Sequence, residues 1–283
     1  MSEPSLRDRI EQYYATVPLV FADAEEFGPL RLFVRKAEGT PYYGGPNHAR
    51  PASAGPVTAT AADIARVRAR QRELGVPESF EWLAEVTPLL RARIEAAGLP
   101  VTERPLMILG PRHPLPPQSL PEGVTIRALG ADDPALPAVL AIPRLAFAAE
   151  GTAVGPAGRA ELAAAAEKLA VDGTVTTIRP SLRAGHKTLV AAFAPDGTPL
   201  AAGHYHPANG ITEIGGIGTL PTARRQGLGA AVMAALAAHA RDHGVHTIFL
   251  AYAEEAVARI YARLGFRMAG TTLLIANQPA RGQ

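Results

Sequence analysis

Residues 221–230 read PTARRQGLGA, and they separate the apolar run ITEIGGIGT (211–219) from the alanine-rich run AAVMAALAAHARDHG (230–244). The first run has the length and β-branched character of a strand, and the second has the composition of a helix. A short segment with one proline, two arginines and two glycines therefore joins a strand to the start of a helix. This strand–loop–helix unit predicts an α/β fold, and its loop is the first candidate for a functional site.

The loop has the features of an anion site. A glycine-rich turn at a helix N-terminus exposes backbone N–H groups that have no partner in the helix, at the positive end of the helix dipole. Gly227 and Gly229 leave room for an anion, and Arg224 and Arg225 add positive charge. A Walker loop is excluded because Gly-Lys-Ser/Thr is missing, and the dinucleotide fingerprint is incomplete. We therefore expect an anion of the size of a pyrophosphate.

The composition excludes several other classes. The chain of 283 residues has 47% hydrophobic and 19% charged residues and a formal net charge of only +2, so it predicts a folded protein and no nucleic-acid partner. It has no cysteine, which excludes disulfides and thiolate metal ligands, and no metal site is expected. The start, MSEPSLRDRIEQYYATV, lacks the features of a signal peptide, and no apolar run is long enough for a membrane span. We expect a cytoplasmic protein without membrane contact.

A proline-rich stretch divides the chain. The segment PRHPLPPQSLP (111–121) cannot form a helix or a central strand, so it is interpreted as a linker between a domain at 1–110 and a domain at 122–277, with a tail at 278–283. Strands are predicted at 123–129, in two segments of 186–207, at 211–221, 246–252 and 266–276. Helices are predicted at 133–149, 156–171, 229–243 and 254–265. This order predicts a mixed central sheet with helices on both faces.

The first domain contains an echo of the last strands. Without any gap, residues 80–109 align with 247–276, so that Trp82 falls on Phe249 and Gly98 on Gly265. Each unit is predicted to be strand, helix, glycine and strand, which indicates an internal duplication. The first copy is degenerate, because TATAADIARV has neither glycine nor arginine cluster before its helix, and Ile94 stands where Tyr261 stands in the second copy.

Two motifs together resemble those of the Gcn5-related N-acetyltransferases. RRQGLG (224–229) is similar to the family's loop Arg/Gln-x-x-Gly-x-Gly/Ala, and IYARLGF (260–266) is similar to its Tyr-x-x-x-Gly-Phe ending. The resemblance covers about residues 122–277 and implies the acyl-CoA N-acyltransferase fold, with acetyl-CoA as the cosubstrate. It implies that the cosubstrate lies between the strands 211–220 and 246–252. It implies these binding residues: Ile217, Gly218, Thr219, Arg224, Arg225, Gln226, Gly227, Leu228, Gly229 and Ala230.

The resemblance also implies the catalytic groups. Glu213 lies fourteen residues before Gly227, the spacing of the catalytic glutamate in the histone-acetylating branch, so Glu213 is expected to accept the proton of the amine. His204 and His206 are reserve candidates for this base, and Glu213 could instead be an edge residue that faces water. Tyr261 matches the general acid of the family, although a core aromatic would give the same pattern. Glu254 departs from the family's usual asparagine at that position.

Three functions remain open at this point. The first is an N-acetyltransferase that moves an acetyl group to a primary amine of a small molecule or peptide by direct attack on the thioester. The second is a non-catalytic sensor that binds acyl-CoA, and the third is an interaction protein with an empty loop. The sheet edge that such folds expose is compatible with a homodimer.

Overall fold

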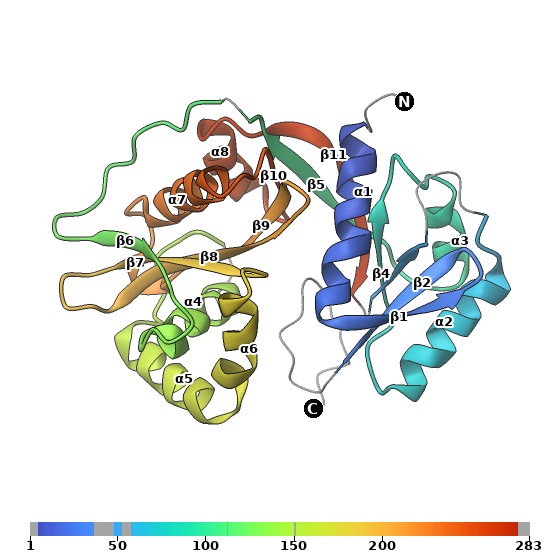
Figure 1. Ribbon diagram of the computed structural model, residues 1–283, viewed down its shortest axis with the longest axis horizontal. Coiled ribbons are helices and arrows are strands. Elements are labelled where there is room, and N and C mark those ends of the chain that lie inside the picture. Colours follow the sequence, from blue (N-terminus) through green and yellow to red (C-terminus); the bar gives the residue numbers. More distant parts are fainter. Residues whose placement is uncertain (1–4, 37–47, 53–57, 112, 150, 277–283) are drawn as a thin grey trace. The chain divides into compact units, whose positions relative to one another are not determined.

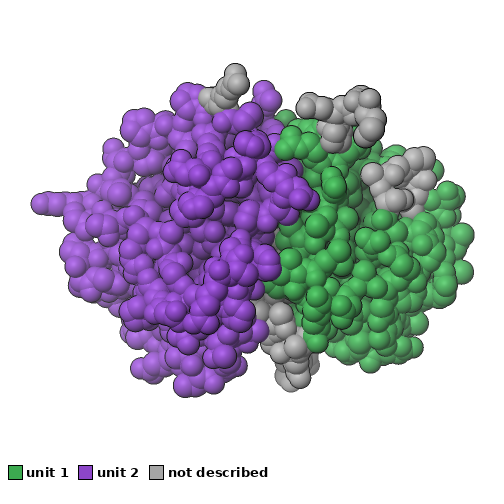
Figure 2. Space-filling view, in the orientation of Figure 1, with its two compact units in different colours: residues 1–106, 268–283 green, residues 107–267 purple. Residues whose placement is uncertain are grey.

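In the computed structural model, residues 5–36, 48–52, 58–111, 113–149 and 151–276 are described. They fall into two compact units (Figures 1 and 2). Unit 1 comprises residues 1–106 and 268–283, and unit 2 comprises residues 107–267. Each unit combines helices with a sheet, as the sequence predicts.

Unit 1 contains a mostly antiparallel sheet in the order β1-β2-β3-β4-β11. Its buried side chains include Phe80, Trp82 and Ile94, which form one core cluster with the last strand. The elements are α1 (Leu6–Thr16), the 3-10 turn η1 (Val17–Val20), β1 (Ala22–Phe27), β2 (Leu30–Arg35), β3 (Ala49–Pro51), α2 (Ala61–Glu73), β4 (Ser79–Leu83), α3 (Leu90–Ala96) and β11 (Arg267–Ala276). The strand β5 (Thr102–Leu109) begins in unit 1 and ends in unit 2.

Unit 2 contains a mixed sheet in the order β10-β9-β8-β7-β6, in which β9 and β10 are parallel and the other pairs are antiparallel. Its elements are β6 (Thr125–Ala128), α4 (Leu136–Ala148), α5 (Arg159–Val171), α6 (Thr174–Arg183), β7 (Thr188–Phe193), β8 (Pro199–Ala208), β9 (Ile211–Thr219), the 3-10 turn η2 (Pro221–Ala223), α7 (Leu228–Asp242), β10 (Thr247–Ala251) and α8 (Glu255–Arg263). The predicted mixed α/β architecture is confirmed, and α6 is an additional helix.

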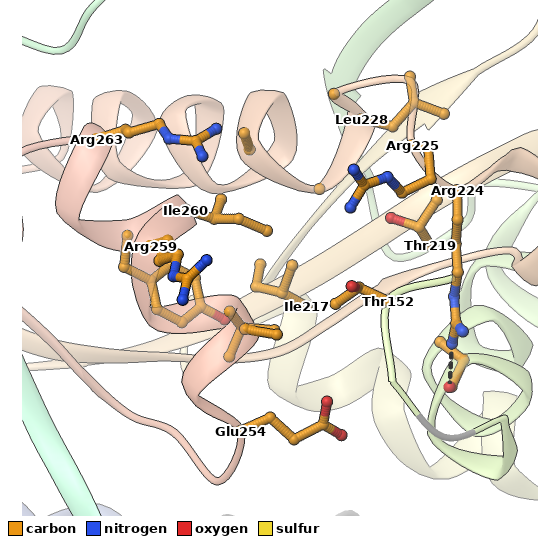
Figure 3. Close-up of a pocket in the computed structure, with 18 of the residues that line it drawn as sticks. Thr152, Ile217, Thr219, Arg224, Arg225, Leu228, Glu254, Arg259, Ile260 and Arg263 are labelled. Carbon is orange, nitrogen blue, oxygen red and sulfur yellow. Dashed lines mark hydrogen bonds between the residues drawn. The ribbon is translucent and has the colours of Figure 1, made fainter. Parts of the chain in front are cut away.

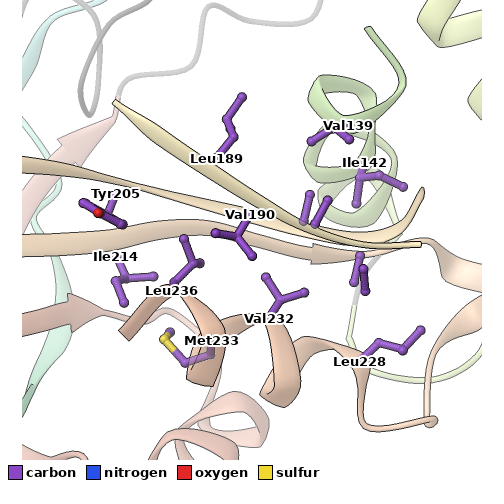
Figure 4. Close-up of a cluster of buried hydrophobic side chains, with 14 of the residues drawn as sticks. Val139, Ile142, Leu189, Val190, Tyr205, Ile214, Leu228, Val232, Met233 and Leu236 are labelled. Carbon is purple, nitrogen blue, oxygen red and sulfur yellow. The ribbon is translucent and has the colours of Figure 1, made fainter. Parts of the chain in front are cut away.

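The core of unit 2 lies on both faces of this sheet. Figure 4 shows α4 above the strands, with Val139 and Ile142 directed at them, and α7 below, with Val232 and Leu236 directed at the opposite face. The backbone of α7 comes close because Gly203 on β8 has no side chain: a Cβ there would lie 2.8 Å from Cδ1 of Leu236. Close packing of this kind holds α7 against the sheet.

The repeated strand–helix–glycine–strand order is present in both halves of the chain. Gly98 follows α3 with a φ of +80°, and Gly265 follows α8 with a φ of +93°, so each closes its helix in the left-handed conformation that favours glycine. The limits of the compact units differ from those of the predicted domains in two places. β11, the last strand of the second copy, pairs with β4 and belongs to unit 1, while the proline-rich segment belongs to unit 2.

None of the helices in the described parts of the chain is both long enough and apolar enough to cross a lipid bilayer.

Candidate functional site

The loop before α7 ends in a helix start that the protein leaves uncapped. Gly227 is the N-cap, with a φ of +78°, and Arg225 also adopts a left-handed conformation, with a φ of +69°. The first bond of the helical ladder joins the N–H of Ala231 to the carbonyl of Gly227 at 3.1 Å. The N–H groups of residues 228–230 therefore precede the ladder, and no side chain caps the helix. They form a donor site for an anion.

The matching helix in unit 1 is closed by its own side chains. At the start of α2 the Asp63 carboxylate accepts from the Thr60 N–H at 2.8 Å, and the Asp63 N–H donates to the Thr60 hydroxyl at 3.2 Å. These hydrogen bonds, the first of them from the Thr60 backbone, lower the pKa of Asp63 to about 2. A protein carboxylate already lies at this helix N-terminus, so the start of α2 differs from the uncapped start of α7.

The strands β9 and β10 separate beside the loop. Their ladder pairs Thr247 with Ile211 at one end and Phe249 with Glu213 at the other, whereas β9 continues to Thr219. Gly216, with a φ of +62°, lies in the continuing part, where the pairing of β9 with β8 shifts its register. Such a bulge bends a strand away from its neighbour. Residues 217–219 thus lie beyond the paired part of the two strands, beside the gap between them.

A cavity of about 920 Å³ lies at this gap, entirely within unit 2 (Figure 3). It contains all but two of the predicted site residues. Those that line it are Ile217, Gly218, Thr219, Arg224, Arg225, Gly227, Leu228, Gly229, Ala230 and Tyr261. The fold therefore brings the end of β9, the loop and α8 around one space. Gln226 is exposed and does not line the cavity, and neither does the partly buried Glu213.

The side chain of Arg224, which was expected to bind the anion, contacts backbone carbonyls of the protein instead. Its guanidinium donates to the carbonyls of Ala146, Ala149 and Ala153 at 2.6, 2.9 and 3.1 Å. These carbonyls belong to the end of α4 and the segment after it, which forms one wall of the cavity. Figure 3 shows the side chain turned to this wall. Arg224 thus fixes the wall, and Arg225 is the loop arginine with an exposed side chain beside the cavity.

Three arginines surround the cavity without a salt bridge to any described residue. They are Arg225 from the loop and Arg259 and Arg263 from α8, all labelled in Figure 3. The two on α8 are four residues apart, so they lie on one face of the helix. Sequence reasoning missed this pair, although the spacing in EAVARIYAR was a usable signal. The cavity therefore has an excess of positive charge, with Glu254 as the acid at its edge.

The proline-rich segment is a further wall of the cavity. Pro116, Gln118 and Ser119 line it, and the carbonyl of Ser119 would lie 3.7 Å from a Cβ on Gly227. The Gln118 amide is held by its own segment, since it donates to the Pro116 carbonyl at 2.7 Å. The sequence predicts only an extended linker here. Its role in the cavity has no sequence signal, because an extended chain without periodicity does not show what it packs against.

The glycines of β9 lie close to other parts of the protein. A Cβ on Gly218 would lie 3.0 Å from Cα of Pro143 in α4, and a Cβ on Gly216 would lie 2.5 Å from the ring of His204. Protein atoms therefore occupy the space where side chains of residues 216 and 218 would lie. Gly218 lines the cavity with its backbone. Gly229 has a similar role, since a Cβ there would lie 3.3 Å from the Thr219 hydroxyl. Gly218 thus allows β9 to approach α4, and Gly229 allows the start of α7 to approach β9.

Tyr261 reaches the cavity from α8. Its ring lies 6.1 Å from that of Phe266, in a tilted arrangement. Burial raises the pKa of its phenol to about 12, so the hydroxyl keeps its proton at neutral pH. A protonated phenol in a cavity can donate a hydrogen bond or a proton to a bound group.

Comparison with known proteins identifies a family domain in part of the chain. Residues 161–266 match the model of the acetyltransferase (GNAT) family. This match lies within unit 2 and contains the loop, α7, β10 and α8, so residues 161–266 form a GNAT family domain. No curated protein matches the chain in sequence.

Solved structures share the fold over nearly the whole chain. A GCN5-related N-acetyltransferase from Kribbella flavida is 21% identical with a TM-score of 0.71, covering 98% of this chain and 97% of that one. A tandem GNAT protein from the clavulanic acid biosynthesis pathway is 16% identical with a TM-score of 0.55, covering 99% and 90%. A conserved protein of unknown function from Staphylococcus epidermidis is 14% identical with a TM-score of 0.56, covering 91% and 95%. The chain fits a tandem arrangement of two GNAT-like units.

Proposed function

We propose that the protein is an acetyl-CoA-dependent N-acetyltransferase that acts on a primary amine. The observation that carries the proposal is the uncapped start of α7, which lies in a cavity with three arginines beside the separated strands β9 and β10. Acetyl-CoA fits this space chemically, because its phosphates need N–H donors and positive charge. It supplies an activated acetyl thioester as the group to be transferred.

Each part of the cavity has a role in this proposal. The N–H groups of residues 228–230 hold the pyrophosphate, and Arg225, Arg259 and Arg263 balance its charge and that of further phosphate. By the family resemblance, the backbone of residues 217–219 holds the pantetheine arm. Arg224 positions the wall opposite this arm through its three carbonyl contacts. Gln226 does not line the cavity, and its proposed contact with acetyl-CoA is through its backbone in the loop.

The reaction needs one proton acceptor and one proton donor. An alkylammonium has a pKa of about 10.4, so the amine must lose a proton before or during attack on the thioester carbon. Glu213 is the first candidate for the base, with His204 and His206 on the neighbouring strand as the reserve. Tyr261 is the candidate acid, because its phenol remains protonated and can donate to the departing thiolate.

We expect acetyl-CoA to raise the melting temperature of the protein. A ligand that binds only the folded state at one hundred times its Kd stabilises it by about 2.7 kcal/mol, or a few degrees for a chain of this size. The measurement is a thermal melt with acetyl-CoA, with CoA and with pantetheine, which lacks the phosphates. Acetyl-CoA and CoA should raise the temperature much more than pantetheine. Equal melts with all three would contradict the assignment of the loop.

We expect Glu213→Gln to flatten the rising limb of the pH–rate profile, because an amide cannot accept the proton of the amine. The measurement is kcat/KM against pH, followed by release of free CoA with the best amine of a panel of small-molecule and peptide amines. The acetyl-CoA melt of this variant should stay that of the wild type. A limb that is retained would assign the base to His204 or His206. Binding of acetyl-CoA without turnover of any amine would favour the sensor function instead.

A further inference from the structure

A buried lysine lies against a buried histidine on one face of the sheet of unit 2. Lys187 precedes β7 and is 7% exposed, while His206 on β8 is 1% exposed. The Lys187 Nζ lies 3.2 Å from the His206 Nε2. Burying a lysine ammonium costs free energy unless it has a partner. The roles proposed above for the cavity residues do not include Lys187.

The hydrogen bonds of His206 fix its protonation. Its Nδ1 lies 3.0 Å from the carbonyl oxygen of His186, and since a carbonyl only accepts, this nitrogen carries the hydrogen. In the neutral ring, Nε2 then has a lone pair, which the Lys187 ammonium can meet as a donor. A doubly protonated ring would direct a second N–H at the ammonium. The contact therefore requires a neutral His206.

His204 connects this pair to the bulge in β9. The rings of His204 and His206 lie 5.3 Å apart, edge to face. The His204 ring lies over Gly216, where a Cβ would come within 2.6 Å of its Nδ1. Gly216 comes directly before Ile217, the first cavity residue of β9. The cluster thus extends from a buried lysine to the edge of the cavity.

Glu213 belongs to the same face. It stands directly opposite His206 in the antiparallel ladder of β8 and β9, and side chains of directly opposite residues point to the same side of a sheet. All three candidate bases for the transfer reaction therefore share one face with a single lysine.

Few other charges face the cluster. The titratable groups facing it from the elements around are His186, Lys187, His204, His206 and Glu213. Ionisable groups of the helices packed nearby have other partners or are exposed. Arg179 donates to the Ala131 carbonyl, Arg183 pairs with Asp132, and Arg144 is exposed. His239 lies on the opposite face of the sheet and forms a hydrogen bond with Tyr205. Lys187 is the lysine whose charge acts on both His204 and His206.

We propose that Lys187 is a positioning residue of the transfer reaction: its ammonium orients His206 and places a positive charge beside the groups that accept the amine's proton. The proposal rests on the proposed function. When the amine nitrogen bonds to the acetyl carbon and the carbon–sulfur bond breaks, the amine proton passes to this cluster, and Tyr261 supplies the proton of the leaving thiol. Lys187 keeps the accepting group in its unprotonated form and contacts no substrate itself.

The sign of the effect on pH dependence follows from the charges. Burial, followed by the positive charge of Lys187, lowers the pKa of His204 and of His206 well below 6.5. Burial also lowers the pKa of Lys187, to about 7, so its charge is present in the acidic range where these bases would become protonated. Without the charge the pKa of a nearby base, imidazole or carboxylate, rises. The acid limb of the rate profile then moves to higher pH.

The test compares Lys187→Gln with Lys187→Arg in the full-length protein. In Lys187→Gln the acid limb of kcat/KM should move up by roughly half to one pH unit, with a several-fold lower rate at about pH 6 and little change on the plateau. Lys187→Arg keeps the charge and should keep the limb near its wild-type position. Both variants should retain the melting shift with acetyl-CoA, because Lys187 does not line the cavity.

A second readout does not need turnover. NMR titration of the histidine rings should find His206 neutral, with the hydrogen on Nδ1, in the wild type, and a higher pKa of His204 and His206 in Lys187→Gln. An acid limb and ring titrations that are the same in wild type and Lys187→Gln would overturn the proposal. A wild-type protein that binds no acetyl-CoA and turns over no amine would instead overturn the proposed function, and the ring titrations would still report on the Lys187 contact.

Discussion

Gly227→Glu is expected to abolish the binding of acetyl-CoA, with a loss of affinity of at least about 100-fold. Gly227 is the N-cap of α7, and its backbone lies beside the N–H groups of residues 228–230 that are proposed to hold the pyrophosphate. A carboxylate at this place would repel the phosphates and could itself accept from these N–H groups, as the Thr60 hydroxyl accepts from the Asp63 N–H at the start of α2. The melting shift with acetyl-CoA should disappear.

Two further variants separate charge from backbone strain. Gly227 has a φ of +78°, so any side chain there costs on the order of 1 kcal/mol. Gly244, after the other end of α7, has a φ of +80° and open space around a Cβ, so Gly244→Glu carries the same strain and charge away from the cavity. It should keep the melting shift, and Gly227→Ala should reduce the shift without removing it. A full shift in Gly227→Glu would remove the loop from the binding site.

Tyr261→Phe is expected to lower kcat by roughly 10²- to 10⁴-fold while the affinity for acetyl-CoA stays within about two-fold. The phenol has a pKa of about 12 and is therefore protonated over the working range, as an acid for a thiolate must be. Phenylalanine keeps the ring and its contact with Phe266, and it removes only the hydroxyl. The measurements are release of free CoA for kcat and a titration of the melting shift for affinity.

The matched control is Tyr252→Phe. Tyr252 follows β10, is buried in the same core cluster and has its pKa raised by burial, but it does not line the cavity. Removal of the Tyr252 hydroxyl should leave kcat near the wild-type value and should mainly lower the melting temperature. An unchanged kcat in Tyr261→Phe, or an equal fall in both variants, would exclude Tyr261 as the acid.

Most of unit 2 could be predicted from local sequence patterns. The strand before the loop, the helix after it, and α8 with its closing Gly265 each follow from periodicity and from glycine at a left-handed position. The helix α6 was missed because TVTTIRPSLR has β-branched residues and Pro180, which disfavour a helix in isolation. Burial of Val175 and Ile178 against the rest of the unit stabilises it, and no local pattern shows that contact.

The candidate site divides in the same way. The uncapped start of α7 is a local property of RRQGLG, because glycines without a capping side chain leave the first N–H groups free. It can therefore be predicted from consecutive residues. Arg224 contacts carbonyls more than 70 positions away, Lys187 meets a histidine 19 positions away, and β11 pairs with β4 in unit 1. Only the tertiary structure decides those arrangements. Every residue has the same backbone carbonyl and N–H groups, so the sequence does not indicate which distant residue will bond to them.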